Sequence, residues 1–88
     1  MMPDTMDWDK AAREDFDKIL AKIPVFLRSI AAKKVSARAE DTAAQEGLQS
    51  VSQKNVVDAF FSETPFGFHG PMKTDMEELG IDYEKYGH

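Results

Sequence analysis

The chain has 88 residues, which is room for one small domain with a modest hydrophobic core. Hydrophobic residues make up 42% and charged residues 31%, values that are ordinary for globular proteins and that argue against wholesale disorder. The lack of cysteine excludes disulfides, thiolate metal sites and iron–sulfur ligation by this sequence alone.

The formal net charge of −5 is distributed unevenly along the sequence. Residues 28–38 contain basic side chains and no acid, whereas acids dominate from Asp58 onward. A solvated helix face followed by an acidic tail explains this pattern, and an anion-binding patch is the alternative. No apolar run approaches the about 20 residues of a membrane span, and the first ten residues do not form a secretory signal. We therefore predict a soluble, cytoplasmic protein without a membrane segment.

The first predicted helix covers residues 9–22. Asp9 is placed to cap its N-terminus, because a carboxylate there can accept from the free amides of the first turn. Trp8 precedes the cap and is expected to close one end of the core, with an indole N–H that needs a partner. Apolar residues at three- and four-residue spacing predict one buried stripe, made of Ala12, Phe16, Ile19, Leu20 and Ile23.

Pro24 predicts a tight corner between the first helix and a second one. Proline lacks an amide hydrogen and disfavours helical geometry at the residue before it, so the first helix should end near Lys22. Nothing breaks a helix over residues 25–46, and Gly47 is a natural C-terminal stop. The buried side of this long helix is expected to contain Phe26, Leu27, Ile30, Ala31, Val35, Ala39 and Ala43.

A short link over residues 48–51, extended if ordered, leads to a third predicted helix over residues 53–62. Ser52 is suited to cap this helix through the amide of Asn55. Apolar residues at helical spacing should anchor it to the core: Val56, Val57, Phe60 and Phe61.

The remainder of the chain is rich in turn-forming residues. Residues 65–71 predict a loop whose phenylalanines, Phe66 and Phe68, lie back on the body. Thr74 and Glu77 have capping-box spacing and predict one or two helical turns that Gly80 ends. Residues 81–88 are expected to fray unless a tyrosine, Tyr83 or Tyr86, docks.

These elements predict an all-α fold: a three-helix domain over residues 8–62, with a short, a long and a short helix and an extended link before the third. A loop-rich acidic extension with a short helix follows over residues 63–88. The expected core consists of Phe16, Leu20, Phe26, Ile30, Val35, Val56 and Phe60.

Three ordered segments carry a resemblance to a known family. They are Ile23-Pro24-Val25-Phe26-Leu27-Arg28, then Glu40 with Ala43 and Gly47, then Val51-Ser52 with Val56 and Ala59. In this order they resemble the small C-terminal helical domain of the B subunit of light-independent (dark-operative) protochlorophyllide reductase. The resemblance covers roughly residues 8–60.

The resemblance implies an accessory or interaction domain of an oxidoreductase system in chlorophyll biosynthesis, and so in photosynthesis. In that reductase the cluster-binding and catalytic machinery lies in a large upstream body, which this sequence does not contain. We therefore expect no catalytic residues, no cofactor and no metal site in this chain. The expected partner is a protein, either an oxidoreductase subunit or a second copy, and a tetrapyrrole is a further possibility.

Arg28, Lys34 and Arg38 are the candidate residues for binding a ligand or partner anion. Arg28 stands out because a cation near the start of the second helix is disfavoured by the helix dipole, and an ion pair with Asp15 or Asp17 is the alternative explanation. Lys34 and Arg38 are four residues apart and share a helix face.

Two other classes of function remain open. A histone-like nucleic-acid binder would use a similar order of helices, but the net negative charge argues against phosphate binding. A helical adaptor or dimer unrelated to pigments would use apolar surface that a small domain cannot cover. Exposure of Phe60, Phe61, Phe66 or Phe68 would favour the adaptor.

Overall fold

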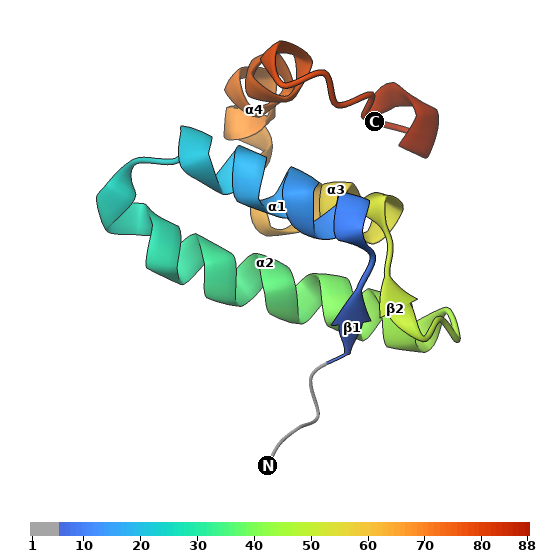
Figure 1. The fold of residues 1–88 in the computed structure, drawn as a ribbon. Helices are drawn as coiled ribbons and strands as arrows, with labels where there is room; N and C mark the ends of the chain where they lie inside the picture. Colours follow the sequence, from blue (N-terminus) through green and yellow to red (C-terminus); the bar gives the residue numbers. More distant parts are fainter. Residues whose placement is uncertain (1–5) are drawn as a thin grey trace.

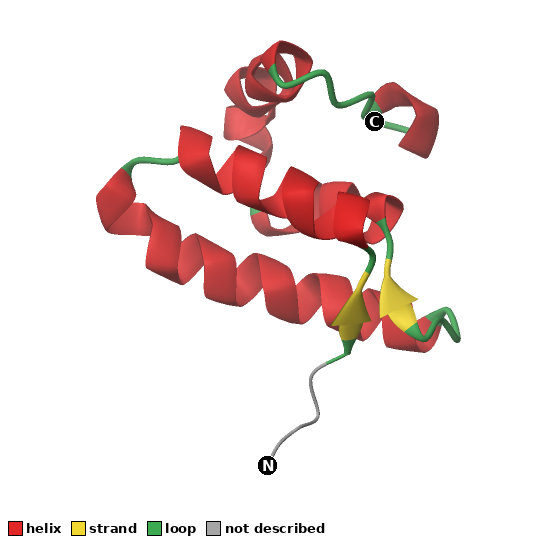
Figure 2. Ribbon diagram, in the orientation of Figure 1, coloured by secondary structure: helices red, strands yellow, loops and turns green. Residues whose placement is uncertain are grey.

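The computed structural model describes residues 6–88, and the molecule is predominantly helical (Figure 2). The all-α fold class is thereby confirmed. Four α-helices, two short strands and two 3-10 turns follow in the order β1 (Asp7–Trp8), α1 (Lys10–Lys22), α2 (Val25–Gln45), β2 (Ser50–Val51), α3 (Gln53–Glu63), η1 (Phe66–Phe68), α4 (His69–Glu78) and η2 (Glu84–Tyr86).

The helices pack around one core (Figure 1). α1 and α2 form an antiparallel hairpin, α3 packs against both, and α4 lies against α1 on the side away from α2. The three main helices match the predicted ranges to within about one residue. Their ends are set by residues that are neighbours in the sequence. Ile23 is extended (φ −85°, ψ 139°) before Pro24, and Gly47 has a left-handed φ of 77° after α2.

The predicted extended link is ordered because it pairs with the residues before α1. β2 runs parallel to β1, with Asp7 opposite Ser50 and Trp8 opposite Val51. The Asp9 amide donates to the Val51 carbonyl at 2.9 Å. Asp9 stands at the N-cap position of α1. The prediction that its side chain caps the helix was wrong, because it makes no hydrogen bond to the amides of the first turn. Its Oδ1 instead accepts a 2.6 Å hydrogen bond from the Ser50 hydroxyl, which ties the two strands together.

Trp8 closes one end of the core as predicted. Its ring lies 5.0 Å from that of Phe16 in an edge-on arrangement, and its indole Nε1 donates to Glu40 Oε2 at 2.8 Å. The guanidinium of Arg13 lies 4.2 Å above the indole ring. The half-buried indole N–H therefore has a charged acceptor on α2.

The N-terminus of α3 has a complete cap. Ser52 Oγ accepts from the amide of Asn55 at 3.2 Å, and Asn55 Oδ1 accepts from the amide of Ser52 at 2.9 Å. Asn55 is fully buried, and its Nδ2 donates to Glu46 Oε1 at 3.0 Å. The predicted cap is confirmed, and Asn55 extends it to the end of α2.

Four members of the predicted core are buried, namely Phe16, Val35, Val56 and Phe60, while Leu20 is partly buried against them. The prediction was wrong for Phe26 and Ile30, which are 78% and 58% exposed. Phe26 precedes the buried Val35 by nine residues, which is about two and a half helical turns, so the two side chains lie on opposite faces.

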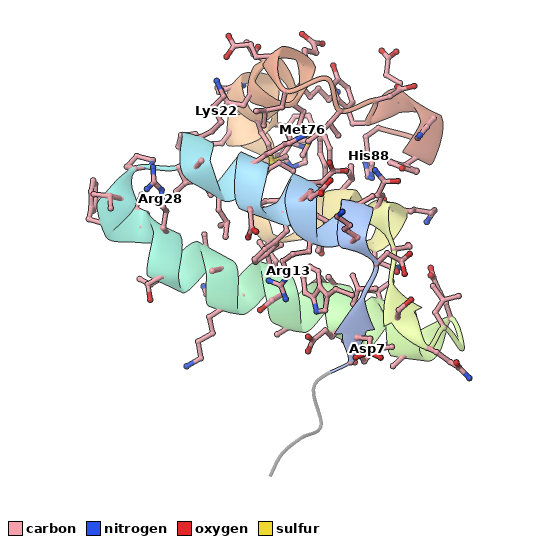
Figure 3. All side chains as sticks on the ribbon, viewed as in Figure 1. Asp7, Arg13, Lys22, Arg28, Met76 and His88 are labelled. Carbon is pink, nitrogen blue, oxygen red and sulfur yellow. The ribbon has the colours of Figure 1, made fainter. Side chains whose placement is uncertain are left out.

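The segment after α3 is more helical than predicted. α4 begins at His69 rather than Thr74, and Thr74 lies inside the helix with its hydroxyl donating to the Gly70 carbonyl at 3.3 Å. His69 Nε2 donates to the carbonyls of Phe61 (3.1 Å) and Thr64 (2.9 Å), because carbonyls only accept. That ring ties the start of α4 to the end of α3, and Met76 anchors the helix in the core (Figure 3).

The last residues dock instead of fraying. Gly80 ends α4 with a φ of 76°, as predicted, and Ile81 and Tyr83 are buried in the core. The ring of His88 stacks on Phe61 at 4.1 Å, and its Nε2 lies 2.6 Å from Asp58 Oδ1.

We expect Tyr83 to ionise only in strong alkali. Its hydroxyl donates to Glu77, and this bond, with burial, raises the pKa of Tyr83 to about 12. The raised pKa means that the folded state holds the proton more tightly than the unfolded state does. Its contribution to stability is therefore complete below pH 10 and lost as the pH rises toward 12. An absorbance titration of phenolate should show a step near pH 12. Tyr83→Phe should remove that step, and a step unchanged in this variant would contradict the assignment.

Candidate interaction surface

Six apolar side chains at one corner of the molecule are left exposed to solvent. Phe66, Phe26 and Phe68 are 88%, 78% and 65% exposed. The other three come from the first turns of α2: Val25, Leu27 and Ile30. We call these six residues the corner surface. The prediction that Phe66 and Phe68 lie back on the body was wrong, because the anchors of this segment are His69 and Met76.

A groove of about 350 Å³ adjoins the corner surface. It lies where the C-terminal end of α1 and the start of α2 meet the end of α3, η1 and α4. Leu27 and Phe68 belong to both the groove and the corner surface, so the two features form one apolar region. The further apolar residues that line the groove are Ile19, Ile23, Pro24, Phe60, Pro65, Pro71 and Met72.

Arg28 stabilises the helix corner from within. Its Nε donates to the carbonyls of Ile23 (2.8 Å) and Leu20 (3.0 Å), and its Nη2 donates to the carbonyl of Ala21 (2.9 Å). These carbonyls form the C-terminal end of α1, which carries partial negative charge. Figure 3 shows the side chain at the gap between the two helices. The alternative of an ion pair with Asp15 or Asp17 was therefore wrong, and the unusual cation has a structural role.

Removing Arg28 should weaken the fold. Arg28→Ala deletes three hydrogen bonds at a helix end, and we expect the free energy of unfolding to fall by about 1–2 kcal/mol in chemical denaturation. Arg28→Lys should recover only part of this loss, because an ammonium cannot reproduce the planar fork. An unchanged stability in Arg28→Ala would mean that the guanidinium is free to serve a ligand.

The other two candidate residues lie together, but Arg28 does not join them. Arg38 Nε lies 2.9 Å from Glu63 Oε2, an ion pair between α2 and α3. Lys34 lines the same shallow hollow as Arg38 and Glu63, as their shared helix face predicts. Arg28 is turned toward the end of α1. The structure thus places two cations beside two acids, Asp41 and Glu63, and anion binding at these residues stays a prediction.

Acidic residues of α4 border the other side of the groove. Asp75 lines it directly, and Glu78 Oε1 accepts a 2.6 Å ion-paired hydrogen bond from Lys22 Nζ. The hydrogen bond to Glu78 raises the pKa of Lys22. The corner surface therefore lies between Lys33 and Lys34 of α2 and the acidic residues of α4.

The histidines are occupied by internal contacts. His88 pairs with Asp58, and His69 donates to main-chain carbonyls. Within residues 6–88, no group of three or more histidine, aspartate and glutamate side chains is placed to hold a metal ion. In the same part of the chain, no helix has both the length and the apolar character needed to cross a membrane.

Comparison with protein families assigns the chain to a family. A family model described as a protein of unknown function, DUF2621, matches residues 3–88. The chain belongs to the DUF2621 family. No curated protein and no solved structure matches it. The corner surface and its groove lie within the part of the chain that the DUF2621 model matches.

Proposed function

We propose that the chain is an interaction domain that docks a protein partner through the corner surface. The observation that carries this proposal is the exposure of Phe26, Phe66 and Phe68 around an apolar groove. A phenylalanine side chain carries roughly 200 Å² of surface, so these three leave roughly 450 Å² of apolar area in water. This area lies within the range of about 300–600 Å² of the largest apolar patch on a typical monomer, and such patches are often binding sites.

The resemblance to protochlorophyllide reductase supports a finer proposal about the partner. The first of its three segments, from Ile23 to Arg28, lies at this corner. Pro24 and Arg28 have structural roles at the turn between α1 and α2. Phe26 is exposed and does not pack in the core. An accessory domain that contacts an oxidoreductase subunit, in a chlorophyll-forming system, would use such a residue at its interface.

A protein segment suits the groove better than a pigment does. Ligand sites for whole organic molecules are concavities of about 300–1,000 Å³ that enclose most of the ligand. The groove of about 350 Å³ is at the low end and open to solvent along the corner surface. A single apolar side chain fits this volume, while a tetrapyrrole macrocycle needs a larger enclosed site. Any pigment contact would therefore be shared with the partner.

Site-specific photo-crosslinking in cells tests the proposed function. A photoreactive phenylalanine analogue replaces Phe26 or Phe66, and replaces Leu48 as the control. Leu48 is exposed but follows the opposite end of α2. We expect discrete adducts from positions 26 and 66 and none from position 48. An oxidoreductase subunit in the adduct supports the finer proposal. The absence of discrete adducts from both corner positions would overturn the interaction role.

A further inference from the structure

We propose that a second copy of this chain occupies the corner surface, in a twofold dimer in which Phe26 of each copy enters the groove of the other. This inference rests on the proposed function, because it names the partner of the same surface, and a second copy is the alternative to the oxidoreductase subunit proposed above. It is carried by three properties of the corner: its shape, its apolar area and the charges along its two sides.

The shape is self-complementary. Leu27 forms part of the groove wall, and Phe26 lies about 100° further around α2 and projects into solvent. A projecting ring and an apolar groove are therefore neighbours on each molecule. In a twofold interface the same patch is used by both subunits, so each can insert its ring into the groove of the other. Phe68 also borders the groove and supplies a second aromatic contact.

The apolar area matches what a dimer of this size needs. A standard interface buries about 800 Å² on each partner, of which about 56–65% is apolar. Phe26, Leu27 and Ile30 lie within about 100° of one another on α2, and with Phe68 they expose roughly 450 Å², taking about 150–200 Å² for each complete side chain. They can therefore supply the apolar part of the interface without other residues.

The charges favour a twofold-related copy over an unrelated acidic protein. One side of the corner surface continues along α2 to Lys33 and Lys34, which follow Ile30 at three- and four-residue spacing. The other side is α4, where Asp75 lines the groove and Glu78 is ion-paired with Lys22 of α1. A twofold rotation about an axis near Leu27 sets the basic side of one copy against the acidic side of the other. Opposite charges at the rim support the pairing even though each chain carries −5.

Sedimentation equilibrium of the 88-residue chain over a concentration series tests the proposal. We expect reversible association to twice the monomer mass of 9.9 kDa. Phe26→Ser should weaken the dimerisation constant by at least about 30-fold, the effect of a central aromatic anchor. Leu48→Ser is the matched control, because it removes an exposed apolar side chain away from the corner and should leave association unchanged.

Circular dichroism and the unfolding midpoint at high dilution show whether each variant is folded. We expect Phe26→Ser to be folded, because the Phe26 side chain is exposed. A wild-type chain that stays monomeric up to about 1 mM overturns the dimer. Equal dimerisation constants for Phe26→Ser and Leu48→Ser would also overturn the dimer. If the chain is monomeric while positions 26 and 66 still crosslink to another protein, the dimer fails and the proposed function stands.

Discussion

Replacing Phe60 with alanine is expected to lower the free energy of unfolding by about 3–5 kcal/mol. Phe60 is 2% exposed, and its ring lies 5.9 Å from that of Phe16. The substitution leaves a cavity between α1 and α3 that these short helices cannot close completely. Small domains have total stabilities of about 5–15 kcal/mol, so much of the fold's stability depends on this ring. Urea denaturation measures the loss.

Phe26→Ala is the matched control, because it removes the same atoms from an exposed position. At dilutions where the chain is monomeric, we expect a loss below about 1 kcal/mol, since Phe26 is 78% exposed. Similar losses in the two variants would mean that Phe26 belongs to the core and that the corner surface does not exist in solution.

Asn55→Ala should have the second largest effect, about 2–3 kcal/mol. Asn55 is fully buried and bonds both to the Ser52 amide and to Glu46 Oε1. Its removal leaves the part-buried Ser52 amide without its acceptor and empties a fully buried site, and losses of this kind cost about 1–3 kcal/mol. The link between the end of α2 and the start of α3 is lost with it.

Ser52→Ala separates the cap from this link. It removes the side-chain acceptor for the Asn55 amide and leaves the contacts of Asn55 with Glu46 and the Ser52 amide in place. We expect a smaller loss, about 1 kcal/mol, by chemical denaturation. If Asn55→Ala cost no more than Ser52→Ala, the bond to Glu46 would contribute nothing to stability.

The helix boundaries were predictable because the chemistry that sets them is local. Pro24, Gly47 and Ser52 act on residues no more than four positions away, and each acts as predicted. The start of α4 was missed because it depends on His69 bonding to the end of α3, a contact that local capping patterns do not include. The pairing of Trp8 with Val51 was also missed, because the two residues are far apart in the sequence and no local pattern connects them.

The corner surface was harder to predict because burial depends on what faces a helix. Phe26 and Ile30 are as apolar as Val35, and only the position of α3 decides which of them it covers. Phe26 and Val35 are nine residues apart, so their side chains lie about half a turn apart around the helix. Counting this separation in the sequence would have assigned them to opposite faces. Arg28 was singled out from the sequence as an unusual cation and a candidate binding residue. Its partners are main-chain carbonyls, which no pattern of side chains reveals.

The parallel pairing of β1 and β2 has a consequence for the order of folding. The paired residues 8 and 51 stand on either side of the whole α1–α2 hairpin. Closing so long a loop costs conformational entropy, which falls sharply once the hairpin has brought the two segments together. We therefore expect the strands to join after the helices have packed. Trp8, the single tryptophan, lies in β1 against Glu40, so its fluorescence reports this late step while helical circular dichroism reports the earlier one.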